Sequence, residues 1–295
     1  MRWQDRPEEA PVFGRGRQWC AVAVAAVCLV FVGPSTPSGA LVSEPLPLPV
    51  GAAKDIVPGR VMTWNICNPC GSAQNLGRAA DIATYAPQVI GLQEACVRDV
   101  EEIRAYLRTF YGLRYHVEYG SVLRNWGRCG GLPWRPGGYG QAILSAAPMA
   151  DPVLKEYPDG GSEDRGYLAV TTSVAGRPVR LFNTHLAQRQ QESFRAKQIT
   201  ALTKAVARHE RTVVLGDFNA VPDAPELGPM WSLAKDADPG CHPAAAPDCG
   251  TTTDWHSKFD YIFLRGFAAR SHAVHPSEYS DHHQFRADLG PIQGP

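Results

Sequence analysis

Residues 212–219 read Thr-Val-Val-Leu-Gly-Asp-Phe-Asn, an apolar run that ends in an acid and an amide. A short apolar run of this kind predicts a buried strand, here over residues 212–215. Asp217 and Asn219 then follow its carboxyl end, which is where α/β folds place their sites. Taken alone, the Asp and Asn could equally form a simple turn, because both favour turns through local hydrogen bonds. The stretch gains meaning from others along the chain that repeat its pattern.

Apolar runs that end in polar residues recur on both sides of this stretch, and they predict strands over residues 60–65, 88–94, 141–144, 167–174, 179–183 and 259–264. Helical spacing is present over residues 79–85, 100–110 and 193–209, and Pro87 stops the first of these helices. Residues 119–139, rich in Gly, Arg and Trp, have the composition of a long loop. Strands that alternate with helices near both ends, with hairpin-like strands between, indicate an α/β protein with mixed sheets.

Polar side chains stand at or just after the ends of these strands: Asn65, Glu94, His185, Asp217 with Asn219, Asp260, and Asp281 with His282. Carboxylate and amide oxygens are hard ligands suited to Mg²⁺, Mn²⁺ or Ca²⁺. Histidines can transfer protons near neutral pH. The sequence contains neither a G-x-S-x-G nucleophile motif nor a phosphate-binding P-loop motif.

Six motifs in this order resemble those of the endonuclease/exonuclease/phosphatase superfamily, which contains pancreatic-type deoxyribonuclease. They are Thr63-Trp64-Asn65, Gly91-Leu92-Gln93-Glu94, Asn183-Thr184-His185-Leu186, Gly216-Asp217-Phe218-Asn219, Phe259-Asp260-Tyr261-Ile262 and Ser280-Asp281-His282. The resemblance covers about residues 60–289. It implies a four-layer α/β/β/α sandwich of two packed mixed sheets, and a metal-dependent phosphodiesterase acting on nucleic acid.

The resemblance also implies the role of each residue. Glu94 would be the main ligand of a Mg²⁺ ion, or of Mn²⁺ or Ca²⁺, assisted by Asn65 and Asp281. The other implied roles form a second set: Asp217 would orient or activate the attacking water, Asn219 would hold a phosphate oxygen, and His282 would act as general base oriented by Asp260.

His185 would donate to the phosphoryl group or to the leaving oxygen, and Arg165 would contact the substrate phosphate. In the deoxyribonuclease branch a Glu orients the first catalytic His, and here the corresponding stretch ends in Gln141. An amide is not a carboxylate, so His185 would be less basic and less suited to act as a general acid.

The N-terminus has the pattern of a targeting segment. Arg15 and Arg17 precede an apolar run from Trp19 to Gly33, and the small residues Ser38-Gly39-Ala40 offer a cleavage site. We expect residues 1–40 to be a signal peptide or an uncleaved anchor, residues 41–59 a flexible lead, and residues 60–290 the catalytic domain. The protein would be a secreted monomer, or else membrane-anchored and extracytoplasmic, touching the membrane only through this segment.

Six cysteines follow the targeting segment, and an even number in an exported protein suggests up to three disulfides. Cys241 and Cys249 flank a Pro- and Ala-rich loop and form the best single pair. Cys67 and Cys70 have zinc-ligand spacing, although no second such pair accompanies them.

The net charge is zero, which argues against bulk electrostatic capture of nucleic acid. Locally, residues 124–135 interleave Arg and Trp, a mix that can follow a phosphate backbone and stack bases, or can be a solvated loop. Two other functions stay open: a sphingomyelin- or phosphoinositide-type phospholipase C or phosphatase, and an inactive binding module. A lipid-active enzyme would be expected to expose an apolar loop, and the sequence shows no long one.

Overall fold

The computed structural model describes residues 44–49, 51–67, 70–188 and 190–290, so the predicted targeting segment lies outside the described residues. From Glu44 onward the described chain clusters into one compact unit. None of its described helices has the length and apolar character needed to cross a membrane.

The first sheet has the strand order β13-β14-β1-β2-β6-β3. Its strands are β1 (Val57–Asn65), β2 (Pro87–Cys96), β3 (His116–Arg124), β6 (Gly138–Ser145), β13 (Ala268–His275) and β14 (Gln284–Gly290). β1 and β2 are parallel, and every other neighbouring pair is antiparallel. The sheet is therefore mixed, as the sequence predicts.

The second sheet has the order β11-β12-β10-β9-β8-β7. Its strands are β7 (Ala150–Glu156), β8 (Gly166–Val174), β9 (Arg177–His185), β10 (Thr212–Asp217), β11 (Lys235–Asp236) and β12 (Asp260–Arg265). β9 and β10 are parallel, and their neighbours run antiparallel to them. The decisive stretch at residues 212–217 is thus a central strand, buried along its whole length.

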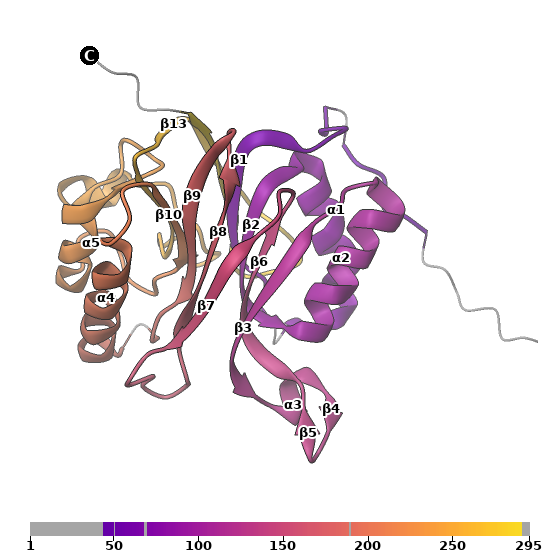
Figure 1. Ribbon diagram of the computed structural model, residues 1–295, viewed down its shortest axis with the longest axis horizontal. Helices are drawn as coiled ribbons and strands as arrows, with labels where there is room; N and C mark the ends of the chain where they lie inside the picture. Colours follow the sequence, from indigo (N-terminus) through magenta and orange to yellow (C-terminus); the bar gives the residue numbers. More distant parts are fainter. Residues whose placement is uncertain (1–43, 50, 68–69, 189, 291–295) are drawn as a thin grey trace, which may run out of the picture. The chain divides into compact units, whose positions relative to one another are not determined.

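Helices cover the outer face of each sheet, as Figure 1 shows. α1 (Asn75–Tyr85) and α2 (Val97–Tyr111) pack on the first sheet, and α4 (Glu192–Val206) and α5 (Gly228–Leu233) pack on the second. Side chains alternate between the two faces of each strand, so Val61 points between the sheets while Met62 points toward the helices. Three separate apolar layers result, and they confirm the four-layer α/β/β/α sandwich.

The region predicted as one long loop at residues 119–139 is different in the structure. β3 continues through Arg124, because its residues pair with β6 as far as Gly138. The remaining residues, 125–137, form a projection that we call the arm. It contains the short helix α3 (Trp126–Cys129) and the hairpin of β4 (Gly131–Leu132) and β5 (Arg135–Pro136), visible at the bottom of Figure 1.

Candidate active site

Three buried side chains form the centre of the site: Asp217, Asp260 and His282. Asp217 ends β10 and pairs in register with Asp260 at the start of β12, which brings the two carboxylates together. His282 lies in the loop between β13 and β14. Its Nδ1 is 2.8 Å from an oxygen of Asp260, and its Nε2 is 3.8 Å from an oxygen of Asp217. The imidazole ring therefore bridges the two carboxylates.

The loop of His282 is tied to the end of β1, a strand of the same first sheet as β13 and β14. The indole of Trp64 donates to the His282 carbonyl at 2.9 Å. The Ser280 hydroxyl accepts from the His282 N–H at 3.1 Å and donates to the Asn65 carbonyl at 2.7 Å. These bonds explain why Trp occurs in the Thr63-Trp64-Asn65 motif and Ser in the Ser280-Asp281-His282 motif: both side chains hold His282 in place between the two sheets.

The charges at this centre are strongly coupled. Burial alone would lower the pKa of His282, but the carboxylates of Asp260 and Asp217 outweigh it and raise that pKa to about 10. Burial raises the pKa of Asp260, so it shares one proton with His282; we place this proton on the ring, which a second carboxylate also faces. Burial would also raise the pKa of Asp217, yet His282 and His185 hold it well below its usual range. At neutral pH Asp217 is therefore ionised.

His185 stands on the opposite side of Asp217. It ends β9 in register with Asp217, and its Nε2 is 3.3 Å from the Asp217 carboxylate. The side-chain amide nitrogen of Asn219 lies 3.0 Å from the same Nε2 and also donates to the Leu186 carbonyl. Two histidines thus flank one ionised aspartate.

Arg165, rather than Gln141, contacts the remaining nitrogen of His185. Its guanidinium is 2.6 Å from His185 Nδ1. The same guanidinium nitrogen is 3.1 Å from Nε2, and a guanidinium can only donate, so Arg165 faces the ring as a hydrogen-bond donor. Gln141 is buried on β6, and its amide nitrogen has no hydrogen-bond partner within the described part of the chain. Among the described side chains, the His185 ring is contacted by Arg165 and Asn219 and not by Gln141.

Glu94 and Asp281 form the face of the site that suits a cation. Burial raises the pKa of Asp281, His282 opposes the rise, and repulsion from Glu94 adds to it. Two oxygen-rich acidic groups that repel each other fit a hard divalent ion. The Asn65 amide nitrogen donates to Glu94 at 3.2 Å and to Asp217 at 3.0 Å, while its oxygen accepts from the Cys67 N–H. Its predicted role as a metal ligand stays a prediction.

Two site residues have strained backbone. Glu94 has φ 52° and Asn219 has φ 50°, in the left-handed region that side chains other than Gly seldom adopt. Glu94 lies in a bulge of β2, where the register with β6 shifts between Leu92 and Ala95. Such strain tends to persist where surrounding structure imposes it and a site needs it. Here it turns both side chains toward the common edge of the two sheets.

The Endonuclease/Exonuclease/phosphatase family profile matches residues 62–282. The chain belongs to this family. The family consists of hydrolases of phosphodiester bonds that commonly use divalent metals, and the match spans every predicted motif. A search of curated proteins by sequence found no match.

Solved structures of this family share the fold. D. rerio TDP2 in complex with a single-strand DNA product is 17% identical, with a TM-score of 0.63 over 78% of this chain and 98% of that chain. The human Nocturnin catalytic domain with bound sulfate is 23% identical, with a TM-score of 0.59 over 80% of this chain and 94% of that one. A family member from Beutenbergia cavernae is 24% identical, with a TM-score of 0.60 over 79% of this chain and 71% of its own.

The structure brings all the predicted site residues to one edge: Asn65, Glu94, Arg165, His185, Asp217, Asn219, Asp260, Asp281 and His282. Two further residues at this edge have no signal in the sequence. Trp255 is 43% exposed, and its ring lies 5.3 Å from that of His282, edge to face. Glu163 holds the Arg165 guanidinium at 3.0 Å. Both lie outside regular strands and helices, where periodicity carries no information.

The six described cysteines form three disulfides: Cys67–Cys70, Cys96–Cys129 and Cys241–Cys249. The predicted pair Cys241–Cys249 is confirmed. The zinc alternative for Cys67 and Cys70 is wrong, because a disulfide leaves no thiolate to bind the metal.

Proposed function

We propose that the protein is a secreted, metal-dependent phosphodiesterase that hydrolyses nucleic acid. One observation carries the proposal: His282 and His185 flank the ionised Asp217, with the carboxylates of Glu94 and Asp281 at the same edge. This arrangement combines groups for proton transfer with a site for a cation, which is what in-line displacement at phosphorus requires.

In the proposed reaction His282 takes a proton from water, and Asp260 holds its Nδ1. Asp217 orients that water between the two rings. On the other side His185 and Asn219 donate to the phosphoryl oxygens or the leaving oxygen, and the Arg165 guanidinium lies beside the His185 ring.

Glu94 and Asp281 would hold the metal ion, Mg²⁺ or alternatively Mn²⁺ or Ca²⁺, with Asn65 as a third ligand after rotation of its amide. A divalent ion bound there would neutralise charge on the phosphoryl group and, by repulsion, lower the raised pKa of His282. The protein's own residues supply every proton transfer.

Two observations support the finer parts of the proposal. A structure of the same fold, D. rerio TDP2, was solved with a single-strand DNA product, which favours nucleic acid as the substrate. Three disulfides are typical of proteins made for an oxidising compartment, which favours secretion.

A phospholipid substrate is the second candidate, and one feature favours it. The sequence shows no long apolar loop, yet in the structure the hairpin of the arm exposes Leu132 by 50% and Trp134 by 79%. Exposed Trp and Leu beside Arg are also suited to a membrane interface. The lipid alternative is therefore stronger than the sequence suggested.

A substrate panel tests the proposal. We expect hydrolysis of single- or double-stranded DNA or of RNA with Mg²⁺ or Mn²⁺, and none of sphingomyelin or phosphoinositides. Hydrolysis of lipids alone would contradict it in favour of the second candidate. Tight binding of nucleic acid without hydrolysis under any metal would instead identify an inactive binding module.

A further inference from the structure

We infer that the arm, residues 125–137, binds the single strand of nucleic acid that runs out of the active site, with Trp134 stacking on a base and Arg98, Arg124 and Arg135 holding phosphates. The inference rests on the proposed function, whose substrate class it narrows to unpaired strands. It concerns binding outside the reacting centre.

The arm leaves the first sheet at the same edge as the active site. β3 runs parallel to β2, since both are antiparallel to β6. Cys96 and Leu123 both pair with Tyr139, so the ends of β2 and β3 lie level with each other. Glu94 precedes Cys96 by two residues. A strand whose phosphate lies at Glu94 therefore passes the base of the arm as it leaves the site.

The base of the arm carries three arginines, of which Arg98 lies 3.7 Å from the Asp99 carboxylate. A cavity of about 520 Å³ there is lined by Arg98, Arg124 and Arg135. Residues 119–150 contain three arginines, at positions 124, 128 and 135, and no acidic residue. Among the described residues, no hydrogen bond or ion pair engages the side chains of Arg124 or Arg135. Guanidinium groups left free in a cavity suit phosphate oxygens, which they can bind in bidentate fashion.

The arm also exposes two aromatic side chains to solvent. Trp134 is 79% exposed and Trp126 is 55% exposed. Base faces are free to stack on such rings only where a strand is unpaired, and alternation of stacking rings with cations is typical of single-strand binding. Because of this alternation, we expect the arm to bind an unpaired strand rather than a duplex.

The arm is held in place before any ligand arrives. The disulfide Cys96–Cys129 joins it to the end of β2. Arg128 stacks over the ring of Tyr139 at 4.6 Å and pairs with Glu163, the residue that holds Arg165. A rigid arm loses little entropy on binding, so its contacts add directly to affinity. The same contacts link the arm through Glu163 to the catalytic His185.

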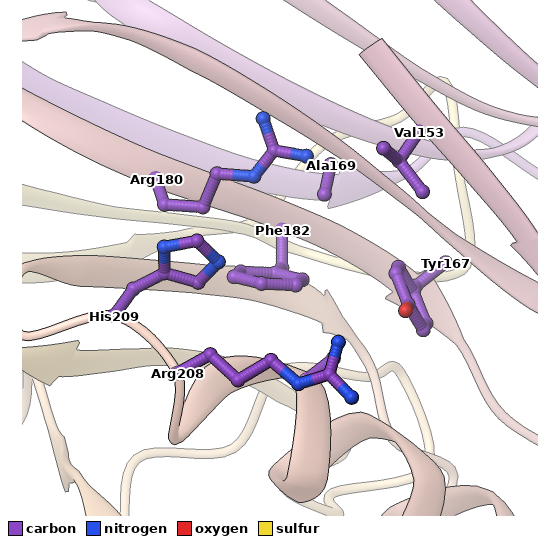
Figure 2. A pocket seen from close by; sticks show the side chains of 8 residues that line it. Val153, Tyr167, Ala169, Arg180, Phe182, Arg208 and His209 are labelled. Atoms are coloured by element: carbon purple, nitrogen blue, oxygen red, sulfur yellow. The ribbon is translucent and has the colours of Figure 1, made fainter. Parts of the chain in front are cut away.

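A second basic hollow of the molecule serves as a contrast. Figure 2 shows it on the outer face of the second sheet, with Arg180 and Arg208 on either side of the Phe182 ring. It has a volume of about 140 Å³ and lies on the middle of β9, away from the strand end that carries His185. Arg180 there donates to the Asp151 carbonyl and the Thr171 hydroxyl, so its guanidinium is already engaged.

The first test measures binding without catalysis. Fluorescence anisotropy with labelled single-stranded DNA of about 12 nucleotides, in EDTA, gives Kd for the wild type and for Trp134→Ala, and we expect a rise of about tenfold. Arg124→Ala with Arg135→Ala should also raise Kd and should reduce the slope of log Kd against log salt by about 1.4. The charge-matched control Lys204→Ala with Arg208→Ala, on α4 and the second hollow, should change neither.

The second test separates the arm from the chemistry. With metal, the arm variants should raise KM for the oligonucleotide by about tenfold and leave kcat/KM for bis(p-nitrophenyl) phosphate within about twofold of wild type. Equal losses on both substrates would overturn the inference, as would unchanged Kd in the variants or a wild type that binds duplex in preference to single strands. A wild type that binds the strand through the arm but hydrolyses neither substrate would overturn the proposed function and leave the inference standing.

A third test uses vesicles of phosphatidylcholine and phosphatidylserine. We expect no co-sedimentation of the wild type. If Trp134→Ala abolishes vesicle binding and leaves the Kd for DNA unchanged, the arm is a membrane anchor and the inference is wrong. Circular dichroism of each variant confirms that the fold is intact.

Discussion

The two sheets contribute to the active site in different ways. The second sheet supplies His185, Asp217 and Asp260 as strand-end residues in a single line of register. The first sheet supplies Glu94 from a strained bulge and the arm from a disulfide-linked projection. Pairing between central strands fixes the residues of the second sheet, whereas a bulge and a disulfide fix Glu94 and the arm of the first sheet. The parts from the first sheet can therefore be loosened separately from the strand-end residues of the second.

Removal of the metal should have the largest effect, and it acts on the first-sheet side. We expect dialysis against EDTA to abolish phosphodiesterase activity and Mg²⁺ or Mn²⁺ to restore it, because Glu94 and Asp281 then repel each other with no cation between them. Glu94→Gln removes one charge at similar volume and should raise the metal concentration needed for half-maximal activity. Full activity after exhaustive chelation would contradict the metal site.

Loss of the proposed base comes next; His282 lies in the β13–β14 loop of the first sheet and contacts Asp260 and Asp217 of the second. His282→Ala should lower kcat by about 10² to 10⁴, the usual contribution of positioned proton transfer, and leave the metal requirement nearly unchanged. Asp260→Asn should cause much of the same loss, because an amide in place of the carboxylate no longer holds the ring in its working tautomer.

His283→Ala is the matched control for the base, since its imidazole contacts the exposed Asp254 instead. It should have little effect on kcat at saturating metal. If kcat falls strongly in His283→Ala and not in His282→Ala, the motif has been assigned one residue out of place. The assignment of Asp281 as a metal ligand would then also be wrong.

Glu163 joins the two sides, and its effect should be intermediate. Glu163→Gln removes the charge that holds both Arg165 and Arg128. We expect kcat to fall by about tenfold, in line with the loss of a hydrogen bond between charged groups. Asp164→Asn, which removes the same charge from the exposed neighbouring residue, should leave kcat unchanged. Equal rates for the two variants would show that Glu163 does not position His185.

Removal of the arm's disulfide should have the smallest effect and should be specific for polymers. Cys96→Ser with Cys129→Ser frees the arm and should raise KM for single-stranded DNA by about three- to tenfold, with little change on bis(p-nitrophenyl) phosphate. Cys241→Ser with Cys249→Ser opens a loop elsewhere and serves as the control. A similar rise of KM in both variants would mean that general destabilisation causes it.

The same contrast explains what the sequence could predict. Asp217 and Asp260 adjoin apolar runs of central strands, so their place at the sheet edge follows from periodicity alone. Edge strands lack that signal. β7 is exposed along its whole length, and β13 is exposed at residues 270–272 and half-buried elsewhere. Each has a neighbour on one side only, and both were missed. The contact between the Arg165 guanidinium and His185 was missed as well, because it depends on how the loop before β8 folds back toward His185.

The left-handed backbone of Glu94 and Asn219 affects which amino-acid substitutions the protein accepts at these two positions. Each residue costs about 1 kcal/mol or more over Gly at such a φ angle. A screen that scores folding alone would therefore accept Gly at both positions. A screen that scores hydrolysis would reject it, because the side chains that carry the chemistry would be gone. The two screens would give opposite rankings at these positions, while at core positions such as Val61 they would agree.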